Sequence, residues 1–319
     1  MAYETGIAKT ERDFLKKLDK FLTTNESLVK NGQNWTKIFE RIIPATTHKV
    51  DRYQVVWKAT GTGIGQDIYV GAETQNLIAD DVYNITFFGG TFFNLELVNQ
   101  INIEDFKNAM VNVSPSVCVY GNARDFEYHF FANGRHFKVV SRIGKTTSTA
   151  YCGFILPTVP PTEYPYPLCI AGTGPTHDSD NHLNRYSRED RLNSSIVYAR
   201  NKSCYLLLPT QVWSGFYGMG GEYKDPALYP IRSIEDDSTQ RWIMQRMVGL
   251  GSTPLIPVEF ISRGQKVGTN RWGCFDGVYW IPGIQRATGD VVNIDNETNG
   301  LVFNDGFRTS TTSYFVFEK

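Results

Sequence analysis

The chain begins with a helical pattern of hydrophobic positions. Apolar side chains recur between positions 14 and 22 at spacings that place them on one face of a helix. These side chains are Phe14, Leu15, Leu18, Phe21 and Leu22. Thr10 precedes this stripe and Asp13 follows three residues later, a near match to a capping box. The pattern predicts an amphipathic helix that starts near Thr10.

A second apolar stripe follows a polar linker and has the same spacing. Its members are Trp35, Ile38, Phe39, Ile42 and Ile43. Pro44 ends this predicted second helix, because the residue before a proline disfavours the helical conformation. Two short amphipathic helices cannot bury their stripes alone, so they pack on the rest of the chain or form a docking arm. Phe14, Leu18, Trp35 and Phe39 are therefore candidate residues of an assembly surface.

From about residue 50 the pattern changes to that of strands and turns. Residues 53–59 and 67–71 predict two strands, joined by a glycine-rich turn at residues 61–65. Residues 83–88 predict another strand, with Gly89 and Gly90 as its turn.

The clearest hairpin prediction covers residues 126–140. Asn-Gly is the preferred pair for a two-residue type I′ turn, so Asn133 and Gly134 form the predicted loop and Phe130 faces Phe137. One face then carries apolar side chains and is expected to face the core. The other face carries Glu127, His129, His136 and Lys138 and is expected to be solvated or interfacial.

The second half of the chain mixes strands with long polar segments. Residues 150–156 predict a buried strand, and the five prolines among residues 157–167 preclude a helix or an interior strand. Residues 172–203 predict a long loop and residues 237–248 a helix. Further strands are predicted at residues 204–208, 255–262, 277–280, 301–303 and 314–317.

These elements predict a mainly β fold, with sandwich-like units after a short two-helix N-terminal arm. The proline-rich segment is the predicted boundary between two halves. We expect a helical arm at residues 1–48, a β-sandwich-like domain at residues 49–170 and a second β-rich domain with long loops at residues 171–319.

Composition and charge narrow the function classes. The formal net charge is −1, which argues against a nucleic-acid binder because such proteins carry a basic excess. We find neither a signal-peptide pattern nor an apolar stretch of the ~20 residues that a membrane helix needs, so we expect synthesis in a cytoplasm and no membrane span. The five cysteines are widely spaced, which predicts buried thiols.

Candidate chemistry is sparse. Gly61, Gly63 and Gly65 lack the third glycine of a nucleotide-binding fingerprint, and no nucleophile motif is present. The compact run from His177 to His182 holds potential metal ligands, but its spacing matches no metal-site pattern. We predict a protein that is not an enzyme, with no catalytic residue, no cofactor and no metal.

Aromatic residues beside glycines and prolines suggest binding surfaces instead. Aromatic rings in such loops suit protein interfaces and sugar faces, and they also suit a buried core. The candidates are Tyr164, Tyr166, Trp213, Phe216, Tyr217 and Trp272.

Several sequence segments resemble a family of virion structural proteins from tailed bacteriophages and prophages. The matching segments are residues 35–39, 56–59 with 67–71, 130–135, 150–157 with 164–168, 276–280 and 303–309. The resemblance implies an assembled component of the tail or baseplate without known catalysis. It implies no list of functional residues.

The leading hypothesis is therefore a virion protein of the phage tail, made in the cytoplasm of the bacterial host. Its expected partners are other tail or baseplate proteins and further copies of itself, in a trimer or a sixfold arrangement. The alternative is a receptor- or glycan-binding module at the tail surface. A cell-wall glycosidase is the third hypothesis; it needs two convergent carboxylates, for which Asp236, Asp237, Asp290 and Asp295 are available.

Overall fold

The structure is a computed structural model of the 319-residue chain. It describes residues 1–43, 52–61, 66–77, 82–99, 103–172, 196, 204–217, 226–230, 254–263, 269–283, 286–304 and 314–319. Within these residues the strands form three large sheets and one two-stranded sheet. The fold is mainly β, as predicted, with several antiparallel sheets and a pair of helices near the N-terminus.

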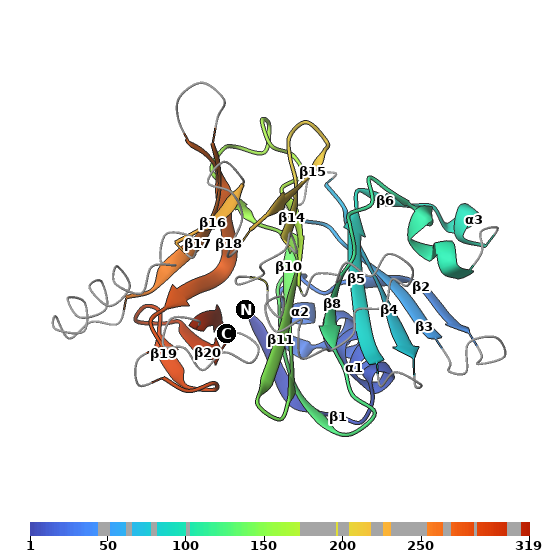
Figure 1. The fold of residues 1–319 in the computed structure, drawn as a ribbon. Helices are drawn as coiled ribbons and strands as arrows, with labels where there is room; N and C mark the ends of the chain where they lie inside the picture. The colour runs from blue at the N-terminus through green and yellow to red at the C-terminus, as the bar shows by residue number, and fades with distance from the viewer. Residues whose placement is uncertain are drawn as a thin grey trace.

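A seven-stranded central sheet runs through the middle of the molecule (Figure 1). Its strands, in spatial order, are β1 (Ala2–Ala8), β9 (Phe126–Ala132), β10 (His136–Ile143), β11 (Thr146–Phe154), β13 (Leu168–Ala171), β14 (Cys204–Leu207) and β15 (Trp213–Phe216). Because β11 pairs with β13 and β13 with β14, this sheet holds strands from both sides of the proline-rich segment. The division into domains stays a prediction.

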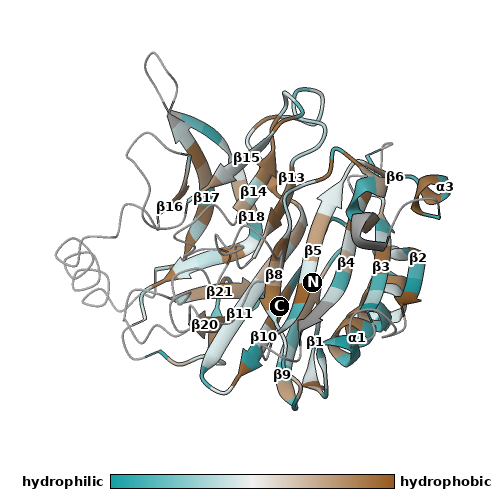
Figure 2. Cartoon of the chain, turned by 45° about the vertical axis from the view of Figure 1, so that its right-hand side comes forward, coloured by the Kyte–Doolittle hydropathy of each residue, from teal (hydrophilic) through white to brown (hydrophobic). Residues whose placement is uncertain are grey.

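A five-stranded sheet packs on one face of the central sheet. Its order is β2 (Thr36–Ile43), β3 (Arg52–Ala59), β4 (Ile68–Leu77), β5 (Val82–Gly90) and β8 (Val117–Tyr120). The large core between the two sheets also takes in α1 (Glu11–Thr24). Figure 2 shows hydrophobic strands in the middle of the molecule and hydrophilic positions on α1 and β2 at its side.

The C-terminal sheet packs on the opposite face of the central sheet. Its order is β16 (Ala227–Tyr229), β17 (Ile256–Arg263), β18 (Thr269–Ile281), β21 (Tyr314–Glu318), β20 (Asn299–Asn304) and β19 (Val291–Asn293), with β12 (Leu156–Pro157) also paired to β18. A second core lies between this sheet and the central sheet. The central sheet is therefore covered on both faces, and every residue of β11 is buried.

The first predicted helix is confirmed. The side chain of Thr10 accepts a hydrogen bond from the backbone N–H of Asp13, as a helix N-cap does, and the predicted stripe is buried. No helix among the described residues has the length and apolar character that would let it cross a membrane.

The second predicted helix is wrong. Residues 36–43 form the edge strand β2, and the second helix is α2 (Glu26–Lys30), inside the segment that we expected to be a linker. A register shift between Lys37 and Phe39 explains the error, because a β-bulge places Ile38 and Phe39 together against the same small core. This adjacency imitates helical spacing in the sequence.

Gly89 and Gly90 do not form a turn. Both lie inside β5, paired with Val70 and Tyr69. Any side chain at Gly90 would collide with Met110, because a Cβ there would lie 2.3 Å from the Met110 Cγ. The glycines allow close packing within the sheet rather than a reversal of the chain.

The predicted hairpin exists, but its register differs by two residues. Phe130 faces Val139, and Ala132 faces Phe137. The side chain of Asn133 explains the wider loop, because its Oδ1 accepts hydrogen bonds from the backbone N–H groups of Arg135 and His136. A shift of two residues preserves the faces of a strand, so the predicted core face is confirmed.

The opposite face was predicted to be solvated or interfacial, and the solvated alternative is wrong for three of its four side chains. His129, His136 and Lys138 are buried, because the C-terminal sheet covers this face of the hairpin. A second covering layer cannot be inferred from the alternation of a single hairpin.

Candidate functional site

An excursion of the chain covers part of the outer face of the five-stranded sheet. It consists of β6 (Phe92–Phe93), α3 (Leu95–Val98), η2 (Ile103–Ala109) and β7 (Met110–Val111). It closes a small outer core in which Phe88 meets Phe106 edge to face, with ring centroids 5.4 Å apart.

Local capping fixes where the excursion turns. Asn94 caps α3, since its Oδ1 accepts hydrogen bonds from the backbone N–H groups of Glu96 and Leu97, both at 3.0 Å. The backbone N–H of Asn94 donates to the carbonyl of Ala109 at 2.8 Å and ties the start of the excursion to its end. The two neighbouring phenylalanines of β6 are thereby held with one ring inward and one outward.

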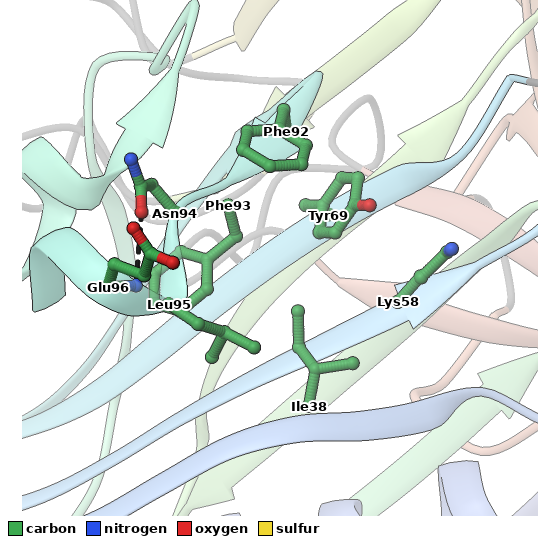
Figure 3. A pocket seen from close by; sticks show the side chains of 8 residues that line it. All are labelled: Ile38, Lys58, Tyr69, Phe92, Phe93, Asn94, Leu95 and Glu96. Carbon is green, nitrogen blue, oxygen red and sulfur yellow. Dashed lines mark hydrogen bonds between the residues drawn. The ribbon is translucent and has the colours of Figure 1, made fainter.

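A pocket of about 520 Å³ lies between this excursion and the sheet (Figure 3). Its lining is Ile38, Lys58, Tyr69, Phe92, Phe93, Asn94, Leu95 and Glu96. Tyr69 and Phe93 are buried, whereas Phe92 is 50% and Leu95 49% exposed. The rings of Tyr69 and Phe92 meet edge to face at 5.9 Å. The volume falls within the range of ligand sites and would also hold large side chains of a partner.

The pocket has opposite charges at its two ends. Figure 3 shows Lys58 on one side of the aromatic rings and Glu96 on the other. The Lys58 ammonium lies 2.7 Å from the Asp67 carboxylate and over the Tyr69 ring, and the hydrogen bond to Asp67 raises the pKa of Lys58. Glu96 is exposed, and among the described residues no cation lies within ion-pair distance of its carboxylate.

A buried cluster of charges lies elsewhere, between the central and C-terminal sheets. Lys138 is fully buried, and its ammonium donates to the backbone carbonyls of Asp276 and Gly277 at 3.3 and 3.0 Å. The rings of Phe131 and Phe317 lie under the same ammonium. Burial lowers the pKa of Lys138 to about 8.

The rest of this cluster surrounds the Asp276 carboxylate. Arg135 forms an ion pair with Asp276, and the Nδ1 of His136 lies 3.5 Å from the same carboxylate oxygen. His136 stacks on Tyr151, and burial holds the pKa of the imidazole well below its usual range, so the ring is neutral at neutral pH. Because its central groups are enclosed, the cluster joins two sheets rather than presenting a reactive surface.

Half of the predicted aromatic and apolar surface residues are in the interior. Phe14, Leu18, Trp35, Tyr164 and Phe216 are buried and pack within this chain. The Trp35 indole N–H donates to the carbonyl of Asn133, and the Tyr164 hydroxyl donates to the carbonyl of Leu207. In this conformation these side chains offer a partner no surface.

The other five are half-buried: Phe39, Tyr166, Trp213, Tyr217 and Trp272. The indole N–H groups of Trp213 and Trp272 already donate to Asn112 and to Ser262. Phe39 belongs to the outer core, beside Phe106. The structure does not gather these five into one site, and their role in assembly stays a prediction.

The pocket was missed by sequence reasoning. A usable signal was the pair Phe92-Phe93 before the cap Asn94, because adjacent residues of a strand point to opposite faces. One of two adjacent large rings must therefore point away from the core, unless a second layer covers it.

Several other sequence candidates lie partly or wholly outside the described residues. The run from His177 to His182 and the pair Asp236-Asp237 are outside them, as are residues 172–203 almost entirely and the predicted helix at 237–248. Asp290 and Asp295 are described, and both accept hydrogen bonds from backbone N–H groups of their own turns. Within the described part of the chain, no three potential ligands gather into a metal site.

The predicted buried thiols are confirmed for four of the five cysteines, and Cys274 is half-buried. None of the five forms a disulfide. Cys169 and Cys204 lie closest, with their sulfurs 3.9 Å apart on neighbouring strands, and burial raises the pKa of Cys169 well above its usual value. Neutral buried thiols of this kind act as small apolar packing groups.

No protein-family model and no curated protein matches the chain.

Proposed function

We propose that this chain is a structural component of a tailed-phage virion, in the tail or baseplate region, that acts through protein–protein assembly. The observation that carries the assembly role is the pocket with Phe92 and Leu95 half exposed at its rim. Large apolar side chains around an open cavity are unfavourable in water and become favourable when a partner covers them. The resemblance of residues 130–135 and 150–157 to virion proteins supports the phage context.

The architecture supports a rigid building block. Three sheets enclose two large cores, and the central sheet is covered on both faces. The partners in this proposal are other tail or baseplate proteins and further copies of the chain. Because phage tails are built on threefold and sixfold axes, the proposed arrangement is a trimer or a sixfold ring.

Immunogold electron microscopy tests the location directly. Antibody against the purified chain is applied to intact phage particles and to particles partly disrupted by mild denaturant, with pre-immune serum as the control. We expect gold at the tail end. Absence of gold from both intact and disrupted particles would contradict a place in the virion.

A second candidate function is the recognition of a host-surface glycan by the same pocket. The observation that favours it is the combination of the Tyr69 and Phe92 rings with the amide of Asn94 and the charges of Lys58 and Glu96. Rings of this kind stack on sugar faces, and polar groups at the rim fix the orientation of a ligand. Titration of the chain with host-surface polysaccharide tests this function. We expect the polysaccharide to bind the wild type and to bind Phe92→Ala more weakly. A calorimetric titration without any heat of binding would contradict this function.

A further inference from the structure

We infer that the pocket of the five-stranded sheet is one half of a twofold interface with a second copy of this chain, in which the Phe92 ring of each copy enters the pocket of the other. The inference names the partner of the pocket and so rests on the assembly role proposed above. It does not depend on where the protein sits in a particle, and it is distinct from the contacts around a threefold or sixfold axis, which would use other surfaces of the chain.

The first argument is the pairing of a cavity with a protrusion on one surface. A twofold interface uses the same patch on both copies, so the patch must contain both a recess and a group that fills it. Here the recess is the 520 Å³ pocket, and the protruding group is the ring of Phe92, which is half exposed at the rim. Aromatic side chains seated in a partner's pocket are the commonest anchors of protein interfaces.

The second argument is the distribution of charge. Lys58 lies at one end of the pocket and Glu96, which pairs with no cation of the described residues, at the other, with apolar groups between them (Figure 3). A patch of this kind is complementary to itself, because a twofold rotation brings the Lys58 end of one copy opposite the Glu96 end of the other. The contact with Asp67 does not use all of the N–H donors of Lys58, since an ammonium has three.

The third argument is the extent of the apolar rim. Val111 pairs directly with Phe92 across β6 and β7, so the two side chains project from the same face. Val111 is 48% exposed and Leu95 49%, which extends the apolar area to both sides of Phe92. This gives the interface an apolar centre between two charged ends, the usual arrangement of a homodimer contact.

Sedimentation velocity of the purified full chain over a range of concentrations tests the inference. We expect reversible dimers for the wild type. For Phe92→Asp we expect a dimer dissociation constant at least about tenfold higher, because the substitution places a charge at the buried centre of the contact. Val291→Asp is the matched control, because Val291 is 55% exposed but lies on β19 at the other side of the molecule (Figure 1). It should leave the dimer unchanged.

Charge reversal tests the twofold arrangement itself. Lys58→Glu and Glu96→Lys should each weaken the dimer about threefold to tenfold, and the double variant should recover most of the loss, because the exchanged charges meet again across the axis. The internal contact of Lys58 with Asp67 is not restored in the double variant, so recovery reports on the contact between copies. Circular dichroism and thermal melts verify that each variant is folded.

Three outcomes would overturn the inference: a monomer at every concentration, an oligomer indifferent to Phe92→Asp, or a double variant weaker than both single variants. A glycan bound at the pocket of a monomer would also overturn it. None of these outcomes bears on the gold label, so a failed dimer and a failed virion location are distinguishable.

Discussion

The buried charge cluster and the open pocket reverse the usual distribution of residues in opposite ways. Around Lys138, charged and polar groups are enclosed between two sheets, whereas around Phe92 large apolar groups face the solvent. The Lys138 ammonium has its hydrogen-bond acceptors within the chain, in the carbonyls of Asp276 and Gly277. The apolar rim around Phe92 has no such compensation within the described structure. The comparison teaches that a buried charged group with hydrogen-bond partners inside the chain serves the fold. An exposed apolar group that the described chain leaves uncovered points to an external partner.

The largest expected effect is the loss of the buried ammonium. Lys138→Ala should lower the free energy of unfolding by about 4 kcal/mol, because it leaves two buried carbonyls and the paired rings without their partner. Denaturation in urea measures this change. Lys138→Met is the control that keeps the volume, and it should cost clearly less. No loss in Lys138→Met would mean that packing alone, and not the ammonium, holds the sheets together.

The adjacent phenylalanines of β6 give the next largest contrast. Phe93 is 3% exposed and Phe92 is 50% exposed. Phe93→Ala should destabilise the chain by about 3 kcal/mol because it opens a cavity in the outer core, and Phe92→Ala by less than about 1 kcal/mol in the monomer. Urea denaturation at a concentration where the chain is monomeric compares them. A comparable loss at Phe92 would show that this ring serves the fold and would weaken its assignment to an interface.

The low pKa of Lys138 predicts an unusual pH dependence. In the folded chain this pKa is about 8, below its value of about 10.5 in the unfolded chain, so between these values the unfolded state binds more protons. Stability therefore rises with pH through this window. The wild type should gain about 2 kcal/mol relative to Lys138→Met between pH 7 and 9.5. Urea titrations of both proteins at the two pH values measure the gain, and parallel behaviour would place the Lys138 pKa near its normal value.

Two glycines with positive φ provide the smallest and most local test. Gly277 (φ +67°) lies under Lys138, and a Cβ there would be 2.8 Å from the ammonium, whereas Gly144 (φ +61°) has nothing within 4 Å. Both substitutions by alanine carry the backbone strain of about 1 kcal/mol. Gly277→Ala should cost about 1–2 kcal/mol more, because it also displaces the ammonium. Thermal melts compare the two variants, and equal shifts would indicate that the cluster adjusts freely.

Local features of the sequence were sufficient for several elements. The stripe behind Thr10 predicted α1 with its N-cap, and alternation around Asn133 predicted β9, β10 and the residues that face the core. These succeed because capping and side-chain alternation act over a few residues. The register of the hairpin was wrong, since the Asn133 side chain took over hydrogen bonds that a two-residue turn would leave to the backbone.

The pocket could not be predicted in the same way. Its residues come from β2, β3, β4, β6 and α3, and they meet only because the chain folds back over the sheet. Because residues 35–43 were predicted to form a helix, Ile38 was not expected to line a pocket on a sheet. A β-bulge and a helix turn place neighbouring apolar residues alike, so the sequence pattern alone did not separate them.

By itself the sequence determined the mainly β class, the capped helix after Thr10 and the apolar face of the hairpin that carries Phe130. Only the tertiary structure decided that Lys138 is enclosed and that Phe92 is open to solvent. The physical reason is that alternation tells which side chains share a face, whereas the burial of that face depends on a layer supplied by distant parts of the chain. For Lys138 that layer is the C-terminal sheet, and for Phe92 we propose that it is a second copy of the protein.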